Sequence, residues 1–230
     1  MTDLLSIGIL PVLITLLAFR AGQFLQQKTK SPICNPILIA VILVLLFLRG
    51  AGMEAAAYQQ GAAMLSWLMT PATVCLAISM YEQIQVLRRN IPMILAGVAA
   101  GAVSCLAIIL IFSLVAGFDS ILTISLLPKS VTTAIGVPLS QISGGMSSIT
   151  TAAIILTGIT ASVLGPWLCR LFRLTDDISR GVAFGTAGHV IGTSKANEFS
   201  PLTGAVSSLS LVVAGLLTAL VMPLAASFLT

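Results

Sequence analysis

One segment of the chain, Leu-Leu-Pro-Lys-Ser-Val-Thr-Thr ending at Thr133, combines residues suited to binding an anion. Lys129 lies in an otherwise uncharged region, where a lysine costs about 2.5–3.5 kcal/mol on membrane-insertion scales. Such a lysine is expected to face an aqueous cavity, a carboxylate or a bound anion. The hydroxyls of Ser130, Thr132 and Thr133 can complete an anion's hydrogen-bond shell. Alternatively, Lys129 extends from a span end towards the interface, while the hydroxyls satisfy backbone groups freed by Pro128. Its position inside an element, beside a break, favours binding.

A second polar segment accompanies a stripe of glycines later in the chain. Gly181, Gly185, Gly188 and Gly192 are spaced four, three and four residues apart, which places them on one helical face. Close packing against another helix is the simplest explanation of that stripe. Packing does not explain the polar side chains within and just beyond it. These are His189, Thr193, Ser194, Lys195, Asn197 and Glu198.

Two of these residues are candidates for contact with a substrate or a coupled proton. His189 is the only histidine and can carry a proton near neutral pH. Lys195 lies three residues before Glu198, so the two can also form a simple pair on a helix. Because ionisable residues within a membrane are expected to have a function, we predict that His189 or Lys195 contacts the substrate or proton.

A third candidate site is Thr-Pro-Ala-Thr ending at Thr73, with Tyr81 at the following membrane edge. Pro71 is expected to kink or interrupt its span, and Tyr81 is expected to anchor the chain at the interface. Catalytic signatures such as H-E-x-x-H, a Walker loop or a G-x-S-x-G elbow are missing. The four cysteines form no C-x-x-C pair and are interpreted as helix-packing residues. We therefore expect no enzyme, no cofactor and no metal site.

The elements that carry these residues are predicted to be membrane helices. The 230 residues are 57% hydrophobic and only 8% charged, with a mean hydropathy of +1.10, whereas soluble domains have about 25% charged residues. A helix needs about 20 mostly apolar residues to cross the bilayer. Continuous runs such as Leu38–Leu48 lack the alternation of barrel strands. Asp, Glu, Lys and Arg are absent from residues 4–19, 31–48, 55–81, 90–118, 130–169 and 199–230.

We predict one all-α polytopic membrane domain over residues 1–230, with seven to eight membrane elements. Two of them, 120–142 and 180–197, are expected to be discontinuous because of their proline, glycine and polar content. Pro128, Gly136 and Pro138 mark the first of these. The predicted elements are 4–25, 33–50, 61–81, 92–117, 120–142, 147–170, 180–197 and 203–228.

Charge placement predicts the topology. Three basic clusters, Lys28/Lys30, Arg88/Arg89 and Arg170/Arg173/Arg180, are expected on the cytoplasmic side. An even number of crossings between the last two clusters then makes 120–142 re-entrant.

The basic residues that give the net charge of +4 lie beside the spans, so nucleic acid is not an expected partner. The first residues lack the basic region of a secretory signal. Interruptions in the third and seventh elements suggest two repeat halves, 1–118 and 119–230.

Several motifs together resemble the LrgB/CidB family of antiholin-like membrane proteins, which is related to the plastidial glycolate/glycerate translocator. They are Pro71-Ala72-Thr73-Val74-Cys75-Leu76-Ala77 with Tyr81, Leu127-Pro128-Lys129-Ser130-Val131-Thr132-Thr133, Gly185-Thr186-Ala187-x-His189-x2-Gly192-Thr193, and Gly204-Ala205-x-Ser207-Ser208-Leu209. The chain departs from the family at Ala134 and at Ser79-Met80, where family members usually carry a proline.

The resemblance implies two alternative functions. One is transport of small monocarboxylates such as glycolate, glycerate or pyruvate across the bacterial inner membrane, with proton coupling as an option. The other is modulation of murein hydrolase export and lysis with a small CidA/LrgA-type membrane partner, in which a second copy of the chain is a further candidate partner. The residues favour the carrier, because a carrier needs a few buried polar groups at broken helices. In that interpretation Lys129 attracts the carboxylate, Thr132, Thr133 and Thr193 orient it, and His189 carries the proton.

Overall fold

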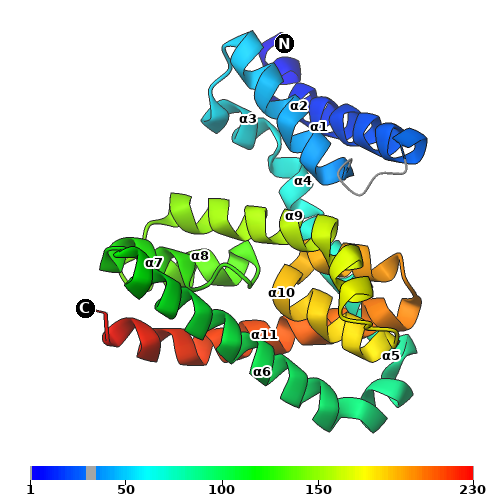
Figure 1. Ribbon diagram of the computed structural model, residues 1–230. Helices are drawn as coiled ribbons and strands as arrows, with labels where there is room; N and C mark the ends of the chain where they lie inside the picture. Colours follow the sequence, from blue (N-terminus) through cyan, green and yellow to red (C-terminus); the bar gives the residue numbers. More distant parts are fainter. Residues whose placement is uncertain (1, 30–34, 230) are drawn as a thin grey trace. The chain divides into compact units, whose positions relative to one another are not determined.

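The computed structural model describes residues 2–29 and 35–229, which fold into eleven helices and no strands (Figure 1). This confirms the predicted all-α class. Cys34 and Lys30 lie outside the described residues. The chain divides into two compact units, Met1–Cys75 and Leu76–Thr230. The division falls at Cys75, whereas the predicted repeat halves meet near residue 118, and the repeat stays a prediction.

The first unit is built on α1 (Thr2–Thr29), against which α2 (Pro36–Ala51) and α3 (Ala55–Gly61) pack. The side chain of Asn35 caps α2 by accepting from the backbone N–H of Ile37, with Pro36 at the first helical position. The hydroxyls of Thr15 and Tyr58 lie 2.6 Å apart and join α1 to α3. Short α4 (Ala63–Trp67) follows, and α5 (Met69–Glu82) crosses the division between the units.

The second unit carries the remaining helices around α10 (Asp177–Asn197). This helix packs against α11 (Pro201–Ser227), α9 (Ser147–Leu171) and α6 (Ile84–Ala116). Two short helices, α7 (Ser120–Leu126) and α8 (Thr133–Ile142), pack against α9. The N-cap of α10 is Asp176, whose carboxylate accepts from the Ser179 N–H, and this bond holds the pKa of Asp176 below its usual value.

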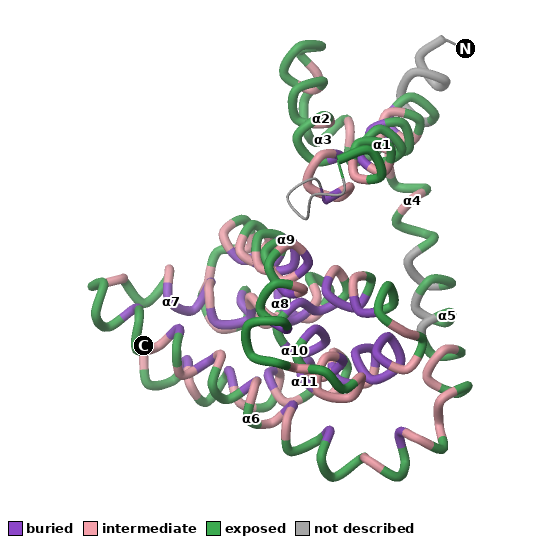
Figure 2. Tube along the Cα trace, turned by 45° about the vertical axis from the view of Figure 1, so that its right-hand side comes forward, coloured by how far each residue is buried: buried purple, intermediate pink, exposed green. Residues whose placement is uncertain are grey.

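Polarity in the second unit is arranged as in a membrane protein, with apolar side chains outside and hydroxyls inside. Large apolar residues such as Val115, Leu216 and Leu220 are exposed, and a soluble protein would not leave so many uncovered. The buried residues concentrate on α10 and α11 (Figure 2). Many of them are small hydroxyl residues, the type that lets membrane helices approach closely and bond across the contact. They include Thr193, Thr203, Ser207, Ser208 and Ser210.

Four helices within the described residues are long and apolar enough to cross a membrane: α1 from Ile9, α6, α9 and α11. The pair α2 and α3, bent by 118°, adds a fifth if it forms one span. The predicted count of seven to eight elements is not confirmed. Helices α7 and α8 are too short, with 7 and 10 residues, and α10 is long enough but not sufficiently apolar.

The predicted element 120–142 is interrupted at Pro128, as expected, but Gly136 and Pro138 do not interrupt it. Both lie inside α8, which continues to Ile142. A Cβ at Gly136 would lie 3.1 Å from the carbonyl oxygen of Pro128, so this glycine lets α8 pack close to the break. Turns satisfy two backbone groups at the break, since the N–H groups of Lys129 and Val131 bond to the carbonyls of Leu126 and Pro128.

The predicted interruption at Pro71 lies earlier in the chain than expected. The helix breaks at Leu68, and α5 begins at Met69, so Pro71 lies in its first turn. Backbone N–H groups in a first turn have no partner within the helix, and a proline there removes no hydrogen bond.

Candidate functional site

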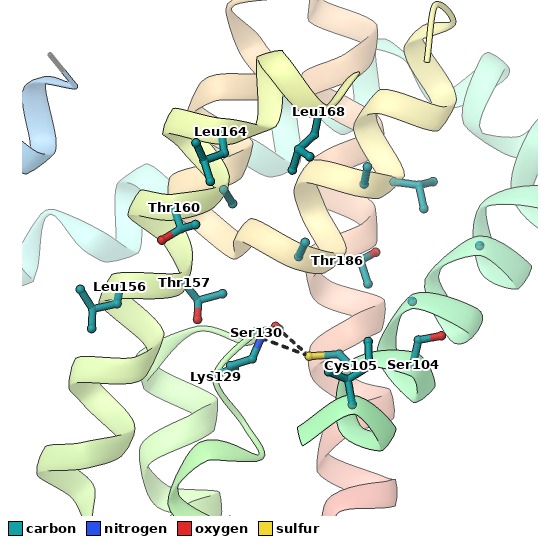
Figure 3. A pocket seen from close by; sticks show the side chains of 17 residues that line it. Ser104, Cys105, Lys129, Ser130, Leu156, Thr157, Thr160, Leu164, Leu168 and Thr186 are labelled. Carbon is teal, nitrogen blue, oxygen red and sulfur yellow. Dashed lines mark hydrogen bonds between the residues drawn. The ribbon is translucent and has the colours of Figure 1, made fainter. Parts of the chain in front are cut away.

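A cavity of about 630 Å³ lies in the second unit between α6, α9, α10 and the break that separates α7 from α8 (Figure 3). Its polar lining residues are Ser104, Cys105, Lys129, Ser130, Thr157, Thr160 and Thr186. Its larger apolar lining residues are Ile108, Leu156, Leu164, Leu168 and Val182. The size falls within the range of about 300–1,000 Å³ typical of small-molecule sites.

Lys129 lies at the break between α7 and α8 and reaches the cavity beside α6 (Figure 3). Its Nζ atom lies 3.4 Å from Ser130 Oγ and 3.5 Å from Cys105 Sγ, and the Ser130 and Cys105 side chains are 3.1 Å apart. The oxygen contact is long for a hydrogen bond, because N–H···O distances centre near 2.9–3.0 Å. The ammonium therefore has weak, neutral partners and unused donor capacity.

No carboxylate of the described residues pairs with Lys129. Among the residues that the structure describes, the single ion pair joins Lys195 to Glu198. A lone positive charge within a low-dielectric lining attracts an anion strongly. Lys129 and Ser130 line a cavity, and their binding role stays a prediction.

Thr186 lines this cavity and carries an unsatisfied hydroxyl. Its side chain is only 6% exposed, and its Oγ1 atom is enclosed without a hydrogen-bond partner. A buried hydroxyl without a partner costs free energy, but a ligand in the cavity does not reach this oxygen in the present structure. Gly101 makes room for it, because a Cβ at Gly101 would lie 2.8 Å from Thr186 Cγ2. Thr186 also lines a small adjoining cavity together with Cys105 and Ser130.

The break predicted in 180–197 occurs at His189, which has φ 42° and ψ −137°. This conformation is unfavourable for a residue with a Cβ, and it interrupts the helix within α10. The ring is buried against Gly158, where a Cβ would lie 2.6 Å from the His189 Cε1 atom. His189 Nε2 donates to the Ile154 carbonyl at 2.9 Å, so His189 fastens α10 to α9. It is not among the residues that line the cavity.

Thr193 and Asn197 also bond to their own helix. Thr193 Oγ1 donates to the His189 carbonyl at 2.9 Å and lies 2.9 Å from Ser207 Oγ on α11. Asn197 Nδ2 donates to the Thr193 carbonyl at 3.1 Å. These hydrogen bonds pair side chains of α10 with carbonyls of the same helix, and the Thr193–Ser207 contact joins α10 to α11.

The remaining predicted site residues do not line the cavity. Thr132 is the N-cap residue of α8, and Thr133 is exposed at its first position. Ser194 is exposed and donates to the Val190 carbonyl.

Four further predicted site residues, Lys195, Glu198, Pro71 and Thr73, are also not among the lining residues of the cavity. Lys195 and Glu198 form the local pair that their spacing allows. Pro71 and Thr73 lie on α5 in the first unit, and the Thr73 side chain lies outside the described part.

The glycine stripe packs closely, but its members face different partners. Gly181 and Gly185 face α11, where added Cβ atoms would meet Val206 and Ser207. Gly188 faces Ala161 on α9, and Gly192 faces the Phe184 carbonyl of its own element. The interruption at His189 separates Gly192 from the other three, because a single face requires a continuous helix.

Sequence reasoning missed five cavity residues: Ser104, Cys105, Thr157, Thr160 and Thr186. The sequence could have pointed to Thr186, since it belongs to the Gly-Thr-Ala motif that carries the family resemblance. The others are isolated small residues within apolar helices, where sequence does not show which face meets a cavity. Cys105, interpreted as a packing residue, contacts Ser130 and Lys129.

These features define an α-helical, multi-pass membrane protein with a positively charged cavity at an interrupted element. Within the described residues, no group of three or more metal-ligating side chains comes together.

The chain belongs to the LrgB-like family, whose family model matches residues 15–228. It is 34% identical over 213 residues to the antiholin-like protein LrgB of Bacillus subtilis (strain 168), and the match covers 92% of each protein. No solved structure matches the chain significantly.

Proposed function

We propose that this protein acts in the bacterial inner membrane as an antiholin-like modulator of murein hydrolase export and cell lysis. The observation that carries the proposal is the match to antiholin-like LrgB through 92% of both chains. In this function a small CidA/LrgA-type membrane protein is the partner, and a second copy of the chain is a further candidate.

The test compares bacterial strains that carry this gene alone, the small partner's gene alone, both, or neither. We expect lower extracellular murein hydrolase activity on zymograms and slower autolysis when both are present. Affinity purification after cross-linking in the membrane should recover the small partner with this chain. Identical zymograms and lysis curves in all four strains would remove this proposal.

We propose a second candidate function, carriage of small organic anions of the glycolate, glycerate or pyruvate type. A specific observation supports it: Lys129 reaches a cavity and has no carboxylate partner among the described residues. A carrier site at an interrupted membrane element uses such groups. Neither candidate function is enzymatic or needs a cofactor.

Proteoliposomes with labelled short acids test the carrier. Uptake should saturate and discriminate between acids, and a neutral dye should be retained. Lys129→Met removes the charge at similar length, and affinity should fall about 10- to 100-fold, the equivalent of roughly 1.5–3 kcal/mol for a charged hydrogen bond. Lys195→Met is the matched control, because Lys195 has a carboxylate partner and does not line the cavity. Equal uptake by both variants, or dye leakage, would contradict the carrier.

Proton coupling by His189 stays a proposal within this second candidate. The His189→Gln variant keeps a donor for the Ile154 carbonyl but cannot titrate near neutral pH. Uptake should then lose its pH dependence while exchange of substrate persists.

A further inference from the structure

The cavity beside Lys129 is much larger than a two- or three-carbon acid. A water molecule's share of liquid volume is about 30 Å³, so about 630 Å³ has room for roughly twenty such units. A glycolate or glycerate has only about five to seven non-hydrogen atoms and leaves most of that space unfilled. The cavity therefore has room for a larger ligand.

The single charge lies at one end of the cavity. Figure 3 shows Lys129, Ser130 and Cys105 near that end, with Leu164 and Leu168 towards the other, and Thr157 and Thr160 between them. Thr157 and Leu168 are eleven residues apart on α9, which is about 16 Å at 1.5 Å per residue. One end therefore suits a charged head, and the other suits hydrocarbon.

The apolar end adjoins a second cavity of about 240 Å³. The two share Ala161, Leu168, Ala183 and Ala187, and the second is lined further by Phe172 and Phe184. Among the described residues, no charged side chain lines this second cavity. The two cavities together are called the apolar tract, and Lys129 lies at its polar end.

We propose that this tract binds an amphiphilic anion, with its carboxylate or phosphate head at Lys129 and Ser130 and an apolar tail along Leu164 and Leu168. This rests on the anion-carrier candidate and names its substrate class. Lys129 supplies the charge, and the Ser130 hydroxyl can donate to the head. A free medium-chain acid and an anionic lipid share this chemistry, and the experiment separates them.

The test is calorimetric titration of the full chain in detergent with acetate, butanoate, hexanoate and octanoate. Burial of one methylene is worth about 0.8 kcal/mol, which is about fourfold in affinity at 1.4 kcal/mol per tenfold. We expect affinity to rise by about two- to fourfold per methylene from butanoate to octanoate. A flat series in which acetate binds as tightly as octanoate overturns the tail and leaves the short-acid carrier standing.

Two variants separate the head from the tail. Lys129→Met should weaken all acids by a similar factor of at least ten. Leu164→Gln should flatten the series and leave acetate unchanged, with Leu168→Ala as a milder variant should Leu164→Gln fail to fold. Leu216→Gln is the matched control, since Leu216 on α11 is 62% exposed, compared with 45% for Leu164, and lies outside the cavity. A normal series in both tail variants overturns the proposal.

A parallel arm tests the lipid source with mixed micelles of phosphatidylglycerol or phosphatidylcholine. Thermal stabilisation by phosphatidylglycerol alone, lost in Lys129→Met and in Leu164→Gln and not displaced by octanoate, identifies a lipid as the amphiphilic anion. Octanoate binding without such stabilisation identifies a free acid. Absence of any Lys129-dependent binding in both arms overturns both the amphiphilic site and the carrier candidate.

Discussion

Replacing Gly185 by alanine is expected to destabilise the second unit, because α10 and α11 touch at this position. An added Cβ would collide with the backbone carbonyl oxygen of Ser207 and would lie 2.7 Å from Ser210 Cβ. An ordinary contact needs at least 3.4 Å, so relief of the Ser210 contact alone requires a shift of about 0.7 Å, and the closer carbonyl contact requires more. Backbone cannot rotate away as a side chain can, and overpacking of this kind costs about 1–3 kcal/mol.

Thermal unfolding of the purified protein in detergent measures this effect. At this chain length 1 kcal/mol corresponds to about 2–4 °C, so Tm should fall by several degrees. Gly97→Ala is the matched control in the same unit, because its Cβ would meet only the Val182 side chain, at 3.1 Å. We expect the control to stay within about 0.5 kcal/mol of the parent protein. Equal Tm values for the two variants would refute the close-packing argument.

Three further predictions concern the buried hydroxyls, the cap of α10 and the cavity lysine. Thr193→Val should cost about 1–3 kcal/mol, since it leaves the buried Ser207 hydroxyl without its partner. Ser207→Ala should cost less, about 0.5–1.5 kcal/mol, because Thr193 keeps its bond to the His189 carbonyl. In a double-mutant cycle, additive costs would show that the two do not interact. Asp176→Ala should cost about 1 kcal/mol at pH 7. Because the folded pKa of Asp176 lies below its ordinary 3.8, its contribution is present above about pH 3.8 and is lost as the pH falls through the folded value; a cost that is constant from pH 7 to pH 2.5 would contradict this. Lys129→Met should insert into the membrane at least as well as the parent protein and unfold at the same or a higher Tm, because it removes an unpaired charge from an apolar region. A lower Tm would show that Lys129 has a structural role.

The sequence by itself determined the helical membrane class and the interruption at Pro128. Uncharged runs long enough for membrane helices require paired backbone groups, and a proline removes one donor wherever it lies inside a helix. It also located Lys129, because a single charge in an apolar run is visible without coordinates. The same reasoning failed at Pro71 and Pro138, since the cost of a proline depends on where the helix begins and on what packs against it.

Only the tertiary structure decided which polar side chains face the cavity. His189 and Thr193 are as polar as Lys129 in the sequence, yet their hydrogen bonds go to Ile154, Ser207 and the backbone of the interrupted helix. Thr186 resembles any other hydroxyl residue in the sequence, and its lack of a partner follows from the helices that surround it. The physical reason is that hydrogen-bond satisfaction is a property of neighbours brought together by folding, whereas charge and hydropathy are properties of the residue alone.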